Sequence, residues 1–395
     1  MSTTVEIFSA PAAEQDLAIV NLRELEDRAA KVLQNGPFGY ISGGSGDEIT
    51  LRENVEAFDN YRIVPRYLTG LDEPDISTEI FGTKVAAPIF CPPMAAHGLA
   101  HTTAELGSSH GWGESNCLYT MATLSNTSIE HIATSNPAGP KWFQLYFAKD
   151  KGLNAELLQR AKATGATAIV FAVDLERPGN READIKNDFH FPSVLKFPNI
   201  PGALAGESLG EIMKLFKHGL DWDDVTFVRE ASGLPVIVKG LLSPDDAKVA
   251  IEYGASAIGV SNHGGRQLDN VPGAIVALPP IAEAVQGRIP IFLDGGVRRG
   301  VHILEAIALG ASAVGVGRPT LYSLALGGWR GVHDMVEHLK QEFALAMKLS
   351  GAGRVGDIHA GMLVPQSTSI RPGFGGKSSD SFWQGNRSLM SNEVL

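Results

Sequence analysis

Several short apolar runs in this sequence end in polar side chains that can transfer protons or bind anions. The residues at these ends are Ala95-Ala96-His97, Gln144, Tyr146, Asp174, Lys239, Ser261-Asn262-His263, Asp294 and Arg318. Each run has the length and content of a strand that is buried on both faces. Polar groups ringed by apolar walls have pKa values shifted by desolvation and by neighbouring charges. The pattern therefore predicts an active site with acid–base and anion-binding groups.

Two glycine-rich loops have the composition of a phosphate site. Asp294-Gly-Gly-Val-Arg-Arg-Gly300 opens a helical segment, and Gly315-Val-Gly-Arg-Pro319 follows another apolar run. Glycines let backbone N–H groups approach an anion, a helix N-terminus adds its positive end, and arginine binds two oxygens at once. Either loop alone is also compatible with a simple tight turn. Together they predict a phosphate-bearing cofactor or substrate.

An internal repeat indicates which elements position these residues. Three segments share a glycine, a small pair and an apolar run: Gly165-Ala-Thr-Ala-Ile-Val-Phe171, Gly254-Ala-Ser-Ala-Ile-Gly-Val260 and Gly310-Ala-Ser-Ala-Val-Gly-Val316. An amphipathic segment precedes each one, over residues 153–163, 244–253 and 301–309. The glycine stands where a helix C-cap is expected, and Ser243 before Pro244 is a typical N-cap. These are helix-to-strand units.

Eight buried strands alternate with helices between about residues 85 and 350. The three repeated runs join further candidates at 87–91, 118–122, 142–145, 235–238 and 290–293. Unbroken alternation with right-handed crossovers predicts an α/β fold, a closed (β/α)8 TIM barrel, with a doubly wound open sheet as the alternative. In such barrels the active site lies at the carboxyl ends of the strands, and phosphate binds after strands seven and eight.

We expect three regions along the chain. Residues 1–80 form an N-terminal helical cap with a helix over 22–33, and residues 81–364 form the barrel. A long connection after the fourth strand, about residues 178–220, is expected to act as a lid. Residues 365–395, rich in glycine and serine, are expected to form a surface tail.

Composition excludes several functional classes. With 33 basic and 44 acidic side chains, the net charge is −11, which argues against nucleic acid as a partner. The apolar content of 44% supplies a large core. Cys91 and Cys117 are too few for a disulfide framework and indicate buried thiols in a reducing compartment. No segment reads as a membrane span or a secretory signal, so we expect a soluble, cytoplasmic protein.

Five motifs, in order, resemble the FMN-dependent L-2-hydroxy acid oxidase and dehydrogenase family. They are Phe38-Gly-Tyr-Ile-Ser-Gly-Gly-Ser-Gly-Asp47, Pro93-Met-Ala-Ala-His-Gly-Leu-Ala-His101, Ser261-Asn-His-Gly-Gly-Arg-Gln267, Asp294 to Gly300, and Gly317-Arg-Pro319. The likeness runs from Tyr40 to about Leu363. The second motif and Ala325-Leu-Gly-Gly-Trp329 are most similar to the bacterial L-lactate oxidases.

The resemblance implies FMN as the cofactor and assigns residues to hold it. The phosphate would bind to Asp294, Gly295, Gly296, Val297, Arg298, Gly317 and Arg318. Lys239 would lie near the N1 and O2 side of the flavin, where its charge favours the anionic reduced ring. Gln144, Pro93, Met94 and Ala95 would hold the pyrimidine and the N5 edge.

The resemblance also implies how a small L-2-hydroxy acid would bind and react. Arg181 and Arg266 would bind its carboxylate with help from the Tyr40 hydroxyl, with Ala95 beside it. Tyr146 would bind the substrate hydroxyl. His263 would be the base and Asp174 the group that orients it. The product would be a 2-oxo acid, with O2 reduced to H2O2, and the assembly a homotetramer.

Some positions depart from the family pattern. Ala122 and Ala172 replace hydroxyl residues that often contact the flavin, which would each remove a hydrogen bond worth about 1 kcal/mol. Leu124 stands where lactate oxidases tend to have an aromatic side chain, so a bulkier apolar substrate is as plausible as lactate. Ala95 resembles oxidases, whereas decarboxylating monooxygenases tend to have glycine there. Phe216, in the lid, is left without a role.

Other functions remain open from the residues alone. Lys239 would also suit a Schiff-base aldolase without flavin. A dehydrogenase or a monooxygenase would carry out the same oxidation of the 2-hydroxy acid as an oxidase. A barrel that has lost turnover would instead be a binding protein. His97 and His101 are four residues apart, but no third ligand follows, so we expect structural roles and no metal.

Overall fold

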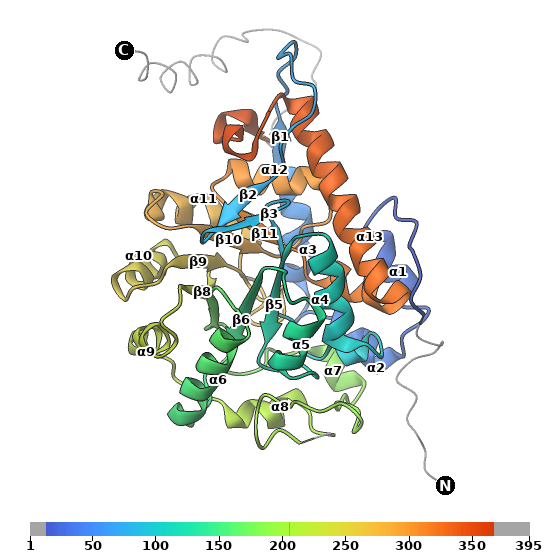
Figure 1. The fold of residues 1–395 in the computed structure, drawn as a ribbon, viewed down its shortest axis with the longest axis vertical. Coiled ribbons are helices and arrows are strands. Elements are labelled where there is room, and N and C mark those ends of the chain that lie inside the picture. Colours follow the sequence, from blue (N-terminus) through green and yellow to red (C-terminus); the bar gives the residue numbers. More distant parts are fainter. Residues whose placement is uncertain (1–12, 205, 367–395) are drawn as a thin grey trace. The chain divides into compact units, whose positions relative to one another are not determined.

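A closed barrel of eight parallel strands forms the centre of the computed structural model, which describes residues 13–204 and 206–366 (Figure 1). The strands are β4 (Ile89–Cys91), β5 (Leu118–Ala122), β6 (Lys141–Leu145), β7 (Ile169–Ala172), β8 (Val236–Leu241), β9 (Ala257–Val260), β10 (Ile291–Asp294) and β11 (Ala313–Gly315). They follow one another around the ring in chain order, and β11 pairs with β4 to close it. The barrel is therefore confirmed, and the open sheet is excluded.

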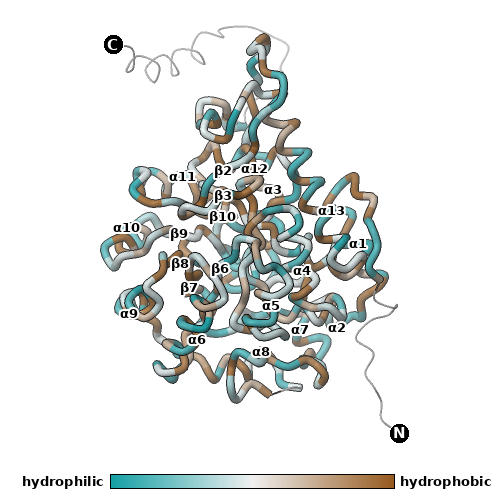
Figure 2. The backbone as a smooth tube through the Cα atoms, viewed as in Figure 1, coloured by the Kyte–Doolittle hydropathy of each residue, from teal (hydrophilic) through white to brown (hydrophobic). Residues whose placement is uncertain are grey.

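Helices surround the barrel and connect its strands (Figure 1). They are α4 (Ala104–Glu114), α5 (Ile129–Ser135), α6 (Lys151–Ala163), α9 (Trp222–Ser232), α10 (Pro244–Glu252), α11 (Ala274–Val285), α12 (Gly300–Ala308) and α13 (Arg318–Ser350), the last kinked at Gly328. Apolar and polar residues alternate along α13, as expected for a helix with one face on the core (Figure 2).

The three repeated glycines end their helices as the sequence predicts. Gly165, Gly254 and Gly310 all have positive φ angles, of 86°, 88° and 110°. The amide that follows each glycine donates to a carbonyl five residues back, for example Ala311 N to Ala306 O at 3.0 Å. This is a Schellman cap, which glycine favours because it lacks a Cβ. At the other end of α10, the Ser243 hydroxyl accepts from the Asp245 and Asp246 amides, so the predicted N-cap is also confirmed.

The N-terminal region packs short helices against the barrel. It contains α1 (Glu24–Ala29), α2 (Asn35–Ser42), α3 (Ile49–Glu56) and the 3-10 turn η1 (Ala57–Asn60), followed by β1 (Tyr61–Ile63), which pairs with β12 (Leu363–Pro365). The helix predicted over 22–33 was too long. The chain turns after Ala29, which buries Leu33, and α2 then begins at Asn35 with Pro37 in its first turn, where proline needs no hydrogen-bond donor.

An antiparallel hairpin fills the amino end of the barrel. Strands β2 (Thr78–Ile80) and β3 (Thr83–Val85) flank Phe81, whose ring packs against Trp142 of β6 and Phe292 of β10, with centroids 6.2 and 5.9 Å apart. These rings form one buried cluster with Phe90. The hairpin therefore closes one end of the barrel and leaves the carboxyl ends of the strands for the site.

The long connection after β7 is packed against the barrel. It contains α7 (Glu182–Lys186), α8 (Leu209–Ile212) and the 3-10 turn η3 (Met213–Leu215). The buried Asn199 accepts from the Ile129 amide at 3.1 Å and donates to the Ser125 hydroxyl at 2.9 Å. The middle of this connection is thus fixed to the loop after β5.

The chain divides into two units, Met1–Val364 and Pro365–Leu395. The tail predicted for 365–395 lies outside the described residues from 367 onward. Cap and barrel, proposed as 1–80 and 81–364, remain our division of the first unit. In the part of the chain that the structure describes, no helix combines the length and hydropathy needed to cross a bilayer.

Candidate active site

A cavity lies at the carboxyl ends of the barrel strands. It is lined by most of the predicted site residues, namely Tyr40, Pro93, Met94, Ala95, Tyr146, Arg181, Lys239, His263, Arg266, Asp294, Gly295, Gly296, Val297, Arg298, Gly317 and Arg318. Gln144 is buried, and Asp174, whose side chain is 9% exposed, contacts the lining residues His263 and Lys239. The residues predicted from the strand ends, from Ala95 to Arg318, therefore meet at one place together with Tyr40, Arg181 and Arg266, which the family resemblance adds.

Sequence reasoning missed several apolar lining residues. Leu175 follows Asp174 directly, Leu209 begins α8, and Ile41 and Leu321 lie on α2 and α13. Leucines carry no chemical signal of their own, so nothing distinguishes them from core residues in the sequence. Phe216, left unassigned, packs edge-on against Tyr146 with centroids 5.7 Å apart.

His263, Asp174 and Lys239 form a chain of contacts behind the cavity. His263 Nδ1 lies 2.9 Å from Asp174 Oδ1, and Lys239 Nζ donates to Asp174 Oδ2 at 3.3 Å. Lys239 Nζ is also 3.8 Å from Asp294 Oδ2. The φ angle of His263 is +57°, in the left-handed region that is uncommon for a residue with a side chain. Such conformations cluster at functional sites, where surrounding contacts hold them.

The surroundings set the protonation state of each of these groups. Burial lowers the pKa of His263, and the charge of Lys239 lowers it further, although Asp174 acts in the opposite direction. Burial alone would raise the pKa of Asp174, but His263 and Lys239 outweigh it, so this pKa is lowered. His263 is therefore neutral near pH 7, and its Nε2, 3.5 Å from the Tyr146 hydroxyl, is available as a base toward the cavity.

Lys239 is poorly suited to form a Schiff base. Burial alone would lower its pKa, but Asp174 and Asp294 outweigh burial and raise it. A Schiff-base lysine must lose its proton to attack a carbonyl, which requires a lowered pKa. The geometry therefore disfavours the aldolase alternative.

Four arginines point to anionic ligands. Arg181, Arg266, Arg298 and Arg318 all line the cavity, and no ion pair joins any of them to a carboxylate within residues 13–204 and 206–366. Burial and the neighbouring charge of Arg266 lower the pKa of both Arg181 and Arg318 to about 10. Asp184 acts on Arg181, and Glu26 acts on Arg298 and Arg318, but neither carboxylate forms an ion pair with them. Cations withdrawn from water without a close counter-charge favour bound anions.

The arginines form two pairs, which meet where Arg266 and Arg318 both donate to the Gly43 carbonyl, at 2.9 and 3.0 Å. Arg181 is 5% exposed and lies with Arg266 beside Tyr40, whose ring centroid is 5.0 Å from the Arg266 guanidinium. Arg298 lies just before α12, and Arg318 opens α13 and donates to the Ile41 and Gly43 carbonyls at 3.2 and 3.0 Å. Two helix N-termini and two guanidinium groups supply the donors that a phosphate site needs.

The residues present fit FMN. The Gln144 amide nitrogen is buried and has no hydrogen-bond partner, which leaves a donor for a ring carbonyl. The Gly295-Gly296 loop approaches Asn54 of α3 so closely that a Cβ at Gly296 would overlap the Asn54 backbone oxygen. This close packing fixes the loop that would carry the phosphate.

His97 and His101 have hydroxyl partners. His97 Nδ1 lies 2.6 Å from Ser108 Oγ, and His101 Nδ1 lies 2.8 Å from Thr103 Oγ1. Among the described residues, no three histidine, cysteine or acidic side chains form a metal-binding group.

Fold and site together are those of a barrel enzyme, with four arginines placed for anionic ligands and a histidine held against a carboxylate. A family model described as FMN-dependent dehydrogenase matches residues 29–365. The L-lactate oxidase of Lentilactobacillus hilgardii is 43% identical over 349 residues, which cover 87% of this chain and 94% of that one. Glycolate oxidase 3 of Arabidopsis thaliana is 40% identical over 354 residues, covering 87% and 95%. The chain belongs to the FMN-dependent dehydrogenase family, and its cofactor is FMN.

Solved structures agree with this assignment. A crystal structure described as Pediococcus acidilactici lactate oxidase matches with a TM-score of 0.86 and 40% identity, covering 91% of this chain and 98% of that one. Mandelate oxidase with (S)-2-phenylpropionate matches with a TM-score of 0.81 and 37% identity, covering 88% and 98%.

Substitution of Gly296 should damage the phosphate loop. We expect Gly296→Ala to lower the free energy of unfolding by about 2 kcal/mol or more, because the methyl overlaps Asn54 and the φ angle is +82°. The affinity of the Gly296→Ala variant for FMN should also fall, because the substitution distorts the loop proposed to bind the phosphate. Thermal unfolding with and without added FMN measures both effects. Gly356→Ala is the control, since nothing lies within 4 Å of its position; equal behaviour of the two variants would contradict the prediction.

Proposed function

We propose that this protein oxidises a small (S)-2-hydroxy acid, lactate-like, to the 2-oxo acid and reduces O2 to H2O2. The observation that carries the proposal is the contact of His263 Nδ1 with Asp174 Oδ1 at 2.9 Å, at a cavity that Arg181 and Arg266 also line. A base beside two carboxylate-binding cations suits a substrate with a hydroxyl next to a carboxylate. Relatives named L-lactate oxidase, glycolate oxidase and 2-hydroxyacid oxidase support it.

In this proposal the substrate is fixed by its polar groups. Arg181 and Arg266 bind the carboxylate, with the Tyr40 hydroxyl beside them and Ala95 on the wall of the cavity. Burial raises the pKa of Tyr146, so its hydroxyl remains a neutral donor to the substrate oxygen. Two cations on one carboxylate restrict the substrate to one orientation, which supplies much of the rate by positioning.

His263 and Asp174 handle the proton. His263 Nε2 accepts the proton that the substrate loses, and the Asp174 carboxylate, 2.9 Å from Nδ1, stabilises the resulting imidazolium. Bound FMN supplies the acceptor for the two electrons. Pro93, Met94, Ala95, Gln144, Lys239, the loop Asp294 to Arg298, Gly317 and Arg318 are the residues proposed to hold it.

Three leucines form an apolar wall of the cavity. Leu124, Leu175 and Leu209 line it, from the ends of β5 and β7 and from the start of α8. Each extra buried methylene on the substrate is worth about 0.8 kcal/mol if it fits. We propose that 2-hydroxy acids with larger aliphatic side chains are accepted alongside lactate.

A graded panel of 2-hydroxy acids tests the proposal. Flavin bleaching without oxygen and H2O2 release in air are measured in parallel for each acid, with D-lactate as the control for L-lactate. Bleaching together with peroxide supports an oxidase. Bleaching without peroxide would make the protein a dehydrogenase or monooxygenase, and no bleaching by any acid would reject the function.

The pH dependence follows from His263. Its lowered pKa places the acid limb of kcat/KM below the ordinary histidine value of about 6.5, because the base is lost only when the imidazole is protonated. Activity should therefore be flat from neutral pH down past about 6.5 and then fall tenfold per pH unit. Initial rates across pH 4–9 check this, and an acid limb above pH 7 would contradict it.

We also propose a cytoplasmic homotetramer. The two cysteines are buried free thiols, which suits a reducing compartment. Light scattering should give about four times the chain mass of 42.0 kDa, and cell fractionation should place the protein in the cytosol.

A further inference from the structure

The side chain of Gln267 joins the two loops that carry the acid–base pair and the arginines. Gln267 ends the motif that begins at Ser261, and the proposed chemistry gives it no task. Its Oε1 accepts from the Gly179 amide and from Arg181 Nη2, both at 3.2 Å. Its Nε2 donates to the Asp174 carbonyl at 2.9 Å and the Arg177 carbonyl at 2.8 Å. All four hydrogen-bonding positions of the amide are used.

These four partners belong to one short segment. Residues 174–181 carry Asp174 at one end and Arg181 at the other, whereas Gln267 lies on the loop after β9 with His263 and Arg266. The two loops also touch directly, because Arg181 Nε donates to the Arg266 carbonyl at 3.2 Å. A Cβ at Gly179 would lie 2.5 Å from the Arg266 and Gln267 carbonyl oxygens. The side-chain amide of Gln267 therefore bridges two closely packed loops, the segment 174–181 and the loop after β9.

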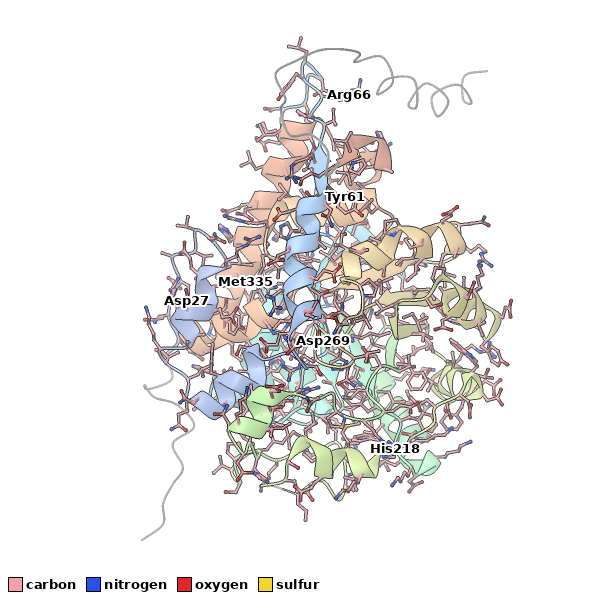
Figure 3. All side chains as sticks on the ribbon, turned by 180° about the vertical axis from the view of Figure 1, so that it is seen from behind. Asp27, Tyr61, Arg66, His218, Asp269 and Met335 are labelled. Carbon is pink, nitrogen blue, oxygen red and sulfur yellow. The ribbon has the colours of Figure 1, made fainter. Side chains whose placement is uncertain are left out.

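The loop after β9 is itself held on its far side. Asp269, which lies at the N-terminus of α3 (Figure 3), accepts from the Thr50 and Ile49 amides at 2.9 and 3.3 Å. These are free N–H groups at the start of a helix, which a carboxylate satisfies well. The loop that carries Gln267 is thus anchored to α3, and Gln267 positions the segment 174–181 against this loop.

We propose that Gln267 is a positioning residue that sets Asp174 against His263 and Arg181 against Arg266. This inference rests on the proposed function of those four residues. One end of the amide fixes the backbone of Asp174, and the other fixes the guanidinium of Arg181. A displacement of about 1 Å in such groups can cost on the order of 100-fold in rate.

Two substitutions separate the two ends of the amide. Gln267→Met keeps the length and removes all four hydrogen bonds, so kcat should fall and KM should rise, with kcat/KM down about 100-fold. Gln267→Glu keeps oxygens for Arg181 and Gly179 but loses both donors. Its KM should stay near wild type while kcat falls. The added negative charge should also raise the pKa of His263 and move the acid limb of kcat/KM to higher pH.

A readout without turnover completes the test. Hydrogen exchange of the peptide over 174–181 should speed up in Gln267→Met, because the Gly179 amide loses its acceptor. Gln159→Met, which removes a surface amide bonded to the Ala231 carbonyl, is the matched control and should change neither exchange nor kinetics. A lower Tm with unchanged kcat, KM and exchange would overturn the proposal. If wild type bleaches with no acid, the proposed function fails, while the exchange result still decides whether Gln267 holds the segment.

Discussion

His263→Asn should slow anaerobic flavin bleaching by about 10²- to 10⁴-fold while the purified protein stays yellow. This range is typical for loss of a general base. Asparagine is chosen because it enters the left-handed region more readily than most residues, and the φ angle here is +57°. The fold and the FMN site should therefore be retained. Stopped-flow absorbance measures the rate, and the flavin content of the protein measures the retention.

The control for this variant is His218→Asn. His218 is exposed and does not line the cavity (Figure 3). The flavin of the His218→Asn variant should bleach at the wild-type rate. Bleaching of His263→Asn within a factor of ten of wild type would remove His263 from the chemistry.

Lys239→Met should cost about 3–5 kcal/mol of folding free energy at neutral pH. The substitution leaves Asp174 and Asp294 buried without their cation, and removing one partner of a buried pair typically has this cost. Because Lys239 has a raised pKa, its contribution is fully present at neutral pH and is lost only as the pH rises through that value. The destabilisation should shrink in acid, where the stranded carboxylates take up protons.

Lys239→Met should also change the pH profile. The Lys239 charge lowers the pKa of His263, so its loss should move the acid limb of kcat/KM to higher pH. Denaturant unfolding of FMN-free protein at several pH values measures the stability, and initial rates give the limb. Lys248→Met is the control, because Lys248 and Asp245 form an exposed pair worth at most about 1 kcal/mol. Equal losses of stability in Lys239→Met and Lys248→Met would contradict the claim that Lys239 stabilises the fold through Asp174 and Asp294.

Most of the barrel was predictable because its signals are local. Each strand is a short apolar run. The glycines at 165, 254 and 310 end their helices through local hydrogen bonds that do not depend on distant parts of the chain. The carboxyl-end rule then gathers residues from Ala95 to Arg318 without knowledge of any contact, whereas Tyr40, Arg181 and Arg266 come from the family resemblance. The roles of these residues in binding and catalysis stay predictions, which the experiments above address.

Long-range contacts could not be predicted in this way. Asp269 caps α3 from more than two hundred residues away, and no local pattern marks a capping residue outside the helix it serves. Phe81 fills the barrel from a hairpin that resembles any surface turn. Gln267 was visible as part of a motif, but its task depends on where Gly179 and Arg181 lie in space. Leu175 and Leu209 look like core residues until the cavity is seen.

Closure of the ring by β4 and β11 has a consequence during synthesis. Ile89 pairs with Val314, so a ribosome must add more than two hundred residues before the first barrel strand meets its last neighbour. Until then the nascent sheet has two open edges, which invite pairing with other chains. Prematurely terminated products that stop before residue 313 keep those edges, and we expect them to aggregate or to depend on chaperones.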